Sequence, residues 1–200
     1  MLAVRSFAFR LAAAAGSLVA LTALVGLVGL DGTRAIGDRL HHAHEVSQPA
    51  MELLLEADRD FHQMLVAERT LLQLDPGDEV AAELLATRRE NLEQTADRFG
   101  QAVDLLEPRH EPDRWRRAFE DRLAAWRTRA ASVDAAWRNG DPVEARRRAL
   151  AEAGPAFEAA RSVLDELTQV LQEDRRGQLA DGQALVRRHA TALALLIGLA

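Results

Sequence analysis

Apolar residues recur every seven positions along most of the chain, and this spacing constrains the fold more than any other feature. Leu85, Leu92, Phe99 and Leu106 form one such row. A sustained seven-residue repeat keeps the apolar side chains of a helix on one stripe, so that neighbouring helices pack side by side at a shallow angle. The sequence therefore predicts an all-α protein. Further rows are Phe119, Trp126 and Val133; Leu123, Ala130 and Trp137; and Phe157, Leu164 and Leu171.

Three breaks interrupt the repeat, at residues 75–78, 107–113 and 139–142. Each combines turn-forming residues with a proline, which cannot continue a helix. We expect Asp113 and Asp141 to cap the helices that follow, because short polar side chains satisfy the free backbone N–H groups at a helix start. The breaks divide the middle of the chain into four helical segments.

Four helices with short links favour an antiparallel up-down-up-down four-helix bundle over residues 31–189. The first helix is predicted over residues 31–74 and the last over residues 143–189. Gly154 and Pro155 fall inside the last segment, so a short helix near residues 143–153 followed by a break or kink is expected there. In the second helix, Arg88 and Glu93 are expected at the surface.

Residues 11–30 form an apolar run without a charge, long enough to cross a bilayer. The run is longer than the apolar part of a signal peptide, and no cleavage site closes it, so we expect an uncleaved transmembrane helix. Arg5 and Arg10 precede it, and the positive-inside rule then places residues 1–10 in the cytoplasm. Residues 31–189 would lie outside, in the periplasm of a bacterial inner-membrane protein.

A second apolar run begins at Ala190 and continues to Ala200. Eleven residues are too few to span a bilayer as a helix, so we interpret residues 190–200 as the start of a second transmembrane helix in a fragment of a longer protein. An even number of helices between the two runs returns the chain to the membrane, which agrees with this interpretation.

The composition excludes several functions. The chain has no cysteine, which excludes disulfides and thiolate chemistry, and its net charge of −6 argues against a nucleic-acid partner. No nucleophile is paired with a base, and no glycine-rich phosphate loop occurs, so neither an enzyme nor a cofactor is expected.

Two groups of side chains allow a functional and a structural interpretation. His41, His42, His44 and Glu45 lie just after the first apolar run, where they form either a metal site or a solvated face. Their spacing is not that of a zinc site, and we expect the solvated face. Three Trp residues recur every eleven positions and are expected in the core rather than in an aromatic ligand platform; they are Trp115, Trp126 and Trp137.

The first bundle helix is unusually polar at its centre. Met51, Leu65 and Leu72 form a row in which Asp58 takes the fourth place. Arg59 and Arg161 each lie about 29 residues from the nearer apolar run, roughly 43 Å along a helix, so they could meet at one depth. The polar belt of this helix, centred on Arg59 and Gln63 and including Arg69, is expected to form a ligand or dimer contact. Alternatively, its charges only pair with Glu56, Asp60 or Glu68 along the same helix.

Two stretches resemble the four-helix-bundle sensor domain of methyl-accepting chemotaxis proteins. Residues 56–72, EADRDFHQMLVAERTLL, resemble the signature of its first helix, and residues 139–173 resemble the entry into its last helix. The resemblance implies a homodimeric receptor that senses a small molecule or a ligand-loaded binding protein outside the cell. The signal would pass as a small displacement of the last helix through the second span.

In the amino-acid receptors of this family, the ligand sits at the dimer interface, held by arginines of the first helix and polar groups of the last. The resemblance thus implies ligand contacts at Arg59, Gln63, Arg69 and Arg161. The same fold precedes sensor histidine kinases and cyclic-nucleotide signalling enzymes, and a membrane-anchored bundle without a ligand is a further alternative. The cytoplasmic domain that would decide between the outputs is expected after Ala200.

Overall fold

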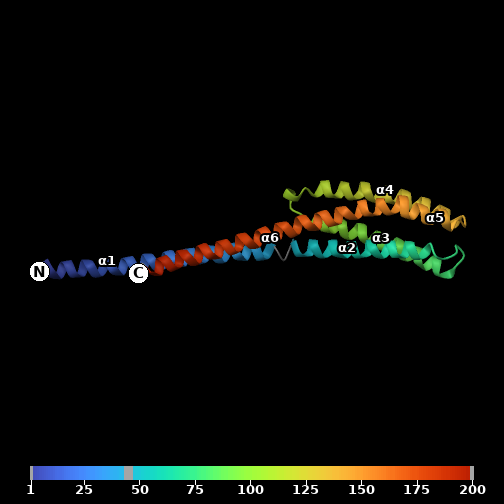
Figure 1. The fold of residues 1–200 in the computed structure, drawn as a ribbon. Helices are drawn as coiled ribbons and strands as arrows, with labels where there is room; N and C mark the ends of the chain where they lie inside the picture. The colour runs from blue at the N-terminus through green and yellow to red at the C-terminus, as the bar shows by residue number, and fades with distance from the viewer. Residues whose placement is uncertain (1, 43–46, 199–200) are drawn as a thin grey trace. The chain divides into compact units, whose positions relative to one another are not determined.

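The computed structural model describes residues 2–42 and 47–198, and this part of the chain is helical without a β-strand (Figure 1). The chain divides into two compact units. One contains residues 1–43 and 174–200, and the other contains residues 44–173.

Helix α1, Leu2–His42, dominates the first unit. Its segment Leu11–Ala35 is long and apolar enough to cross a membrane, and no other described segment meets this criterion. It contains the predicted run 11–30 and extends it by one turn. Leu18, Val19 and Leu27 along it are exposed, as lipid-facing side chains would be. The second span predicted from residue 190 stays a prediction.

The C-terminal part of helix α6, Gly154–Gly198, packs against α1 within this unit. The two helices come close at Gly32, where an added Cβ would lie only 3.2 Å from Cδ2 of His189. His189 Nε2 also lies 3.8 Å from a carboxylate oxygen of Asp31. A glycine at this position thus permits the close approach of the histidine ring.

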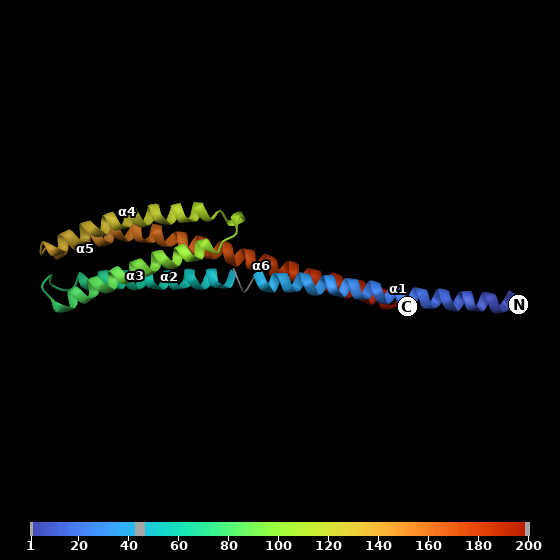
Figure 2. The ribbon, with the colours of Figure 1, turned by 180° about the vertical axis from the view of Figure 1, so that it is seen from behind.

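The second unit is the predicted four-helix bundle. Its first three helices are α2, Gln48–Leu71; α3, Glu79–Asp104; and α4, Pro112–Arg138. The fourth consists of α5, Pro142–Arg148, a π-helical turn, Ala149–Ala153, and the N-terminal part of α6. The α2–α3 and α4–α5 links lie at one end of the bundle and the α3–α4 link at the other, as both views show (Figures 1 and 2).

The predicted helix over residues 31–74 includes residues 43–46, which lie outside the described residues, and on either side of them the structure has α1 up to His42 and α2 from Gln48. Pro49 occupies the first turn of α2. Proline is tolerated in the first turn of a helix, because the backbone N–H groups there have no partner within the helix. In a helix interior, proline removes a backbone hydrogen bond and disrupts the helix.

The last bundle helix changes its geometry instead of breaking at Gly154. The N–H of Gly154 donates to the carbonyl of Ala149, five residues earlier, which defines a π-turn. Such a turn accommodates one extra residue within a continuous helix. Asp141 caps α5 as predicted, since its carboxylate accepts from the N–H of Glu144 at 3.0 Å. Asp113 does not cap α4, which already begins at Pro112.

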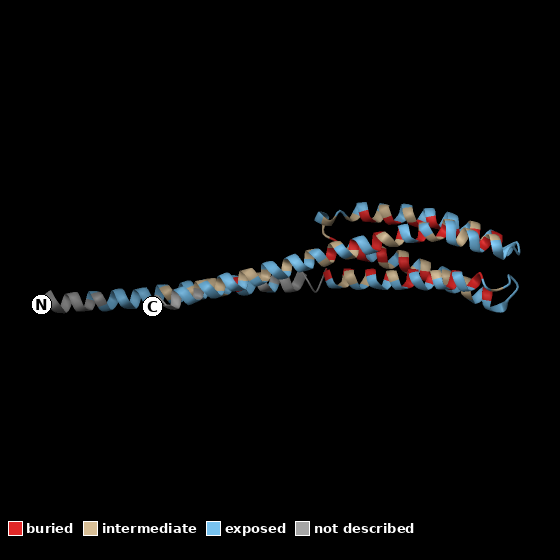
Figure 3. Cartoon of the chain, in the orientation of Figure 1, coloured by how far each residue is buried: buried red, intermediate tan, exposed pale blue. Residues whose placement is uncertain are grey.

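Buried residues follow the inward faces of the four helices (Figure 3). Phe61 of α2 stacks on Phe157 of α6 with ring centroids 4.3 Å apart, and Phe99 of α3 stacks on Phe119 of α4 at 4.1 Å. Trp126 meets the edge of Phe61. All three tryptophans are buried, which confirms that they belong to the core.

The register predicted for the first bundle helix is wrong. Met51, Asp58 and Leu65 are only half-buried. The buried positions form two neighbouring rows, Ala50, Ala57, Met64 and Leu71, and Leu54, Phe61 and Glu68, and Asp60 and Ala67 are buried beside them. The buried acidic residues of α2 are therefore Asp60 and Glu68, not Asp58.

Candidate functional site

The outer face of α2 carries three of the four predicted site residues. Arg59, Gln63 and Arg69 are all exposed there. Two apolar side chains share this face, Leu55 at 58% and Val66 at 63% exposure. Leu55 and Val66 are eleven positions apart, three turns of the helix, and Arg59 and Gln63 lie between them. The outer face thus combines apolar area with hydrogen-bond donors.

Arg59 already has a partner on its own helix. Its Nε and Nη2 donate to Oδ1 of Asp60 at 3.1 and 3.0 Å. The guanidinium is 55% exposed, whereas the Asp60 carboxylate is 2% exposed. Local pairing, the alternative left open by the sequence, therefore holds for Arg59. More than half of its side-chain surface stays exposed.

Arg161 reaches α2 as expected, but it meets Asp58 and not Arg59. Its Nε donates to Oδ1 of Asp58 at 2.8 Å, and its Nη1 lies 3.5 Å from a carboxylate oxygen of Asp165. The hydrogen bond to Asp58 raises the pKa of Arg161 despite the opposing effect of desolvation. Asp58 and Arg161 thus link α2 to α6. The Arg161 guanidinium, which was expected to bind a ligand, is already hydrogen-bonded to the carboxylate of Asp58.

Asp60 belongs to a second link, between α2 and α3. Arg98 of α3 forms ion pairs with Asp60 and with Glu56, the latter at 3.0 Å from Nε. Asp60 therefore receives two guanidinium groups, from Arg59 and Arg98. A buried carboxylate needs such partners, since its desolvation would otherwise favour the protonated form.

A third group joins α2, α3 and α4 through Glu68, Arg88 and Asp134. Arg88 donates to both carboxylate oxygens of Asp134, at 2.6 Å from Nη1 to Oδ1, and its Nη1 lies 3.8 Å from Oε2 of Glu68. Burial raises the pKa of Glu68 to about 7, against the opposing effect of Arg88. The expectation that Arg88 lies at the surface is wrong, because its side chain is only 15% exposed.

These cross-helix pairs were missed because their partners are far apart in sequence. Arg88 and Asp134 are 46 positions apart, and Asp58 and Arg161 are 103 apart. One local signal existed for Arg88: it lies three positions after Leu85 and four before Leu92, so it shares the inward stripe of α3. A long charged side chain on an apolar stripe needs a partner on the facing helix.

The histidine group considered for metal binding lies largely outside the described residues. His44 and Glu45 fall in the gap at 43–46, and the side chains of His41 and His42 are not described either. Within the described residues, no group of three or more His, Asp or Glu side chains is arranged to hold a metal ion.

The sequence matches a known family model over α1 and the bundle. The model, described as the Tar ligand binding domain homologue, covers residues 1–175. A search of curated proteins and a search of solved structures find no match.

Proposed function

The chain belongs to the family of Tar ligand binding domain homologues, the sensor domains of chemoreceptors, and on that premise we propose that it detects a small ligand outside the cytoplasm and signals across the inner membrane for chemotaxis. The family match over residues 1–175 is the observation that carries this proposal. The span candidate Leu11–Ala35 supports a membrane anchor, and Arg5 and Arg10 before it favour a bundle on the periplasmic side.

The outer face of α2 is proposed as the contact between two copies of the chain. Leu55 and Val66 are exposed there and three turns apart, so that two α2 helices could bury them together. The family resemblance implies such a homodimer and a ligand at its interface. Arg59 and Gln63 lie between the two apolar residues and would face that ligand. A small molecule or a ligand-loaded binding protein is the expected partner.

Helix α6 is proposed as the element that carries the signal. It is one continuous helix over Gly154–Gly198, and it contributes Phe157 and Leu164 to the bundle core. A helix transmits a displacement along its axis because its backbone hydrogen bonds make it stiff. The output could serve a histidine kinase or a cyclic-nucleotide enzyme as well as chemotaxis, because the sensor fold is shared among them.

Ligand binding is tested by a thermal-shift screen of the full chain in lipid nanodiscs against amino acids, organic acids and aromatic acids. A ligand that binds only the folded chain raises its melting temperature in a concentration-dependent manner. For a ligand held at the α2 interface, Arg59→Ala should weaken binding by about tenfold or more in calorimetry, as expected for a charge-assisted contact.

The matched control is Arg129→Ala, an exposed arginine of α4. It should leave the affinity within about twofold of the wild-type value. If no compound in the screen shifts the melting temperature, the bundle is better described as a structural membrane-anchored module, and the sensor proposal fails.

A further inference from the structure

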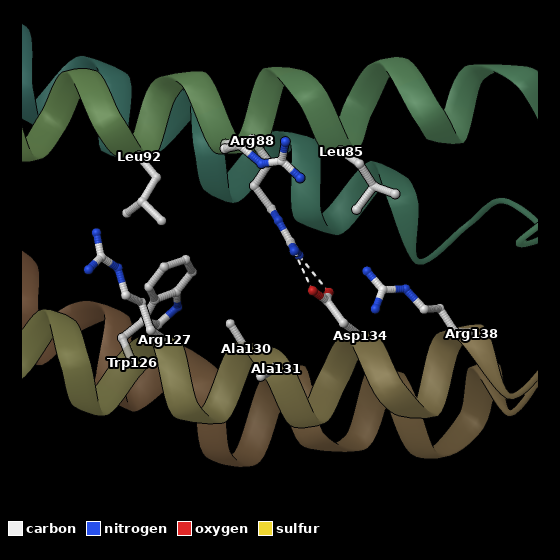
Figure 4. A pocket seen from close by; sticks show the side chains of 10 residues that line it. Leu85, Arg88, Leu92, Trp126, Arg127, Ala130, Ala131, Asp134 and Arg138 are labelled. Atoms are coloured by element: carbon white, nitrogen blue, oxygen red, sulfur yellow. Dashed lines mark hydrogen bonds and ion pairs between the residues drawn. The ribbon is translucent and has the colours of Figure 1, made fainter.

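A hollow of about 250 Å³ lies between α3 and α4, away from the outer face of α2 (Figure 4). Leu85 and Leu92 of α3 form one wall, and Ala130 and Ala131 of α4 lie opposite them. The alanines have no side chain long enough to fill the space between the helices. The hollow therefore results from the small residues of α4 that face α3 at this point.

The hollow is rich in arginine. Arg88 is neutralised by the two hydrogen bonds that it donates to Asp134. Three other arginines line the space, and within the described part of the chain none of them has an ion-pair partner; they are Arg89, Arg127 and Arg138. The hollow consequently presents an excess of positive charge, although the chain as a whole is acidic. Such a site favours an anion.

Trp126 supplies a further unused donor. Its side chain lines the hollow and is buried, with 2% of the residue exposed. Its indole Nε1–H has no acceptor among the described residues. A buried donor without an acceptor is unfavourable, because it has lost its hydrogen bonds to water and gained none in the protein. Because neighbouring atoms cover this nitrogen, a molecule in the hollow would reach it only if the indole ring moved.

The charges are placed at two ends. Arg127 lies beside Leu92, Arg138 lies toward Leu85, and the Arg88–Asp134 pair is between them (Figure 4). Arg127 and Arg138 are eleven positions apart, about 16 Å along α4, and their long side chains can shorten this separation. An inorganic ion has a single charged centre and could engage only one end. A molecule with a charge at each end and a short apolar body matches both.

We propose that the hollow between α3 and α4 binds a small organic dicarboxylate. Arg127 and Arg138 would each receive one carboxylate in the two-pronged geometry that guanidinium groups favour. The apolar body of the ligand would lie against Leu85 and Leu92. The inference rests on the proposed sensor function for its biological meaning, and it assigns that function a ligand class and a site within one protomer, separate from the α2 interface.

The test is a titration of the full chain in lipid nanodiscs with unbranched dicarboxylates from succinate to suberate. Calorimetry gives the affinity, and tryptophan fluorescence, to which Trp126 in the lining contributes, follows occupancy. At least one member should bind in a saturable manner, about tenfold or more tightly than the monocarboxylate of the same chain length. Absence of saturable binding up to about 10 mM for every member would overturn the proposal. Equally tight binding of sulfate would also overturn it, since charge alone would then suffice.

Substitutions assign the binding to the hollow. Arg127→Gln and Arg138→Gln should each weaken dicarboxylate binding by about tenfold and leave little preference over the monocarboxylate. Ala131→Leu, at an exposed lining position, should block the hollow and reduce binding to a similar degree. Arg129→Gln on the same helix is the control, because Arg129 is exposed and does not line the hollow. Circular dichroism checks that each variant keeps its helical content.

Failure of this inference differs from failure of the sensor proposal. If a ligand from the thermal-shift screen loses affinity with Arg59→Ala, and no dicarboxylate responds to Arg127→Gln or Arg138→Gln, the hollow is not a binding site and the sensor proposal stands. If the two hollow variants abolish dicarboxylate binding while Arg59→Ala does not change it, the hollow is the site for this ligand class.

Discussion

At the scale of single residues, Glu68 is a buried acid in a core row of α2. Burial raises its pKa from an ordinary value of 4.5 to about 7, while Arg88 and Arg69 oppose the shift and Asp134 adds to it. Because its pKa is raised in the folded state, the folded chain binds the proton more tightly than the unfolded chain. The stability contribution of Glu68 is therefore complete below about pH 4.5 and is lost as the pH rises through 7.

This predicts a pH-dependent difference between the wild type and Glu68→Gln. Between pH 5 and pH 8, the free energy of unfolding of the wild type should fall by up to about 3 kcal/mol more than that of the variant. Urea unfolding followed by tryptophan fluorescence measures it, since all three tryptophans lie in α4 of the bundle. Glu93→Gln, an exposed acid on α3, should keep the wild-type slope. An unchanged slope in Glu68→Gln would contradict the assignment.

Arg88 should be the most sensitive arginine of α3. Arg88→Ala removes the partner of Asp134 and of buried Glu68 at once, and breaking a buried ion pair in this way destabilises a protein by about 3–5 kcal/mol, somewhat less for a side chain with residual exposure. The measurement is urea unfolding at pH 8, where Glu68 is largely ionised. Glu93→Ala should change the stability by no more than about half a kcal/mol. Equal effects of the two variants would show that Arg88 behaves as a surface residue.

At the scale of helices, the seven-residue rows predict which segments are helical and most of the core. They predict Phe99, Phe119, Trp126 and Phe157 at the centre of the bundle, where the structure places them. They mislead in α2, because Glu68 lies in a buried row and a pattern of apolar residues alone does not anticipate a buried carboxylate. The glycine and proline at residues 154 and 155 predicted an irregularity in the last helix, but its form as a π-turn was not predictable from the sequence.

Two positions in one row of α3 should differ in stability. Phe99 is 2% exposed and stacks on Phe119, so Phe99→Ala should cost about 3–5 kcal/mol. Leu92 is half-buried beside the hollow, so Leu92→Ala should cost less, about 1–2 kcal/mol, because part of its surface is already hydrated. Denaturant unfolding measures the free energy of unfolding of both variants. Equal losses would mean that the hollow is filled in solution.

At the scale of the whole molecule, the proposed membrane topology rests on Arg5 and Arg10 before the apolar run. The bundle should therefore be periplasmic. Alkaline phosphatase fused after Glu107 should be active in bacterial cells, because the enzyme folds only outside the cytoplasm. The control fusion after Arg10, before the span, should be inactive. The reverse pattern of activity would contradict the proposed orientation.

The binding surfaces were less predictable than the fold. The sequence placed Arg59 and Gln63 on a polar face of the first bundle helix, and the structure leaves both exposed. It could not show that Asp58 engages Arg161, or that α3 and α4 leave a hollow between them, because both depend on how distant segments pack. The periodicity of apolar residues indicates which face of each helix points inward, but not which helix packs against that face.

The central claim is that binding outside the membrane changes an output inside it. Its most direct test fuses residues 1–189 to the second transmembrane helix and the cytoplasmic signalling half of a bacterial chemoreceptor and measures kinase activity in cells by energy transfer between labelled signalling proteins. A ligand that binds the purified chain should change kinase activity in a dose-dependent manner, and a substitution that abolishes binding should abolish the response. A ligand that binds the purified chain, yet leaves the kinase activity of an active hybrid unchanged at saturating concentration, would contradict the account.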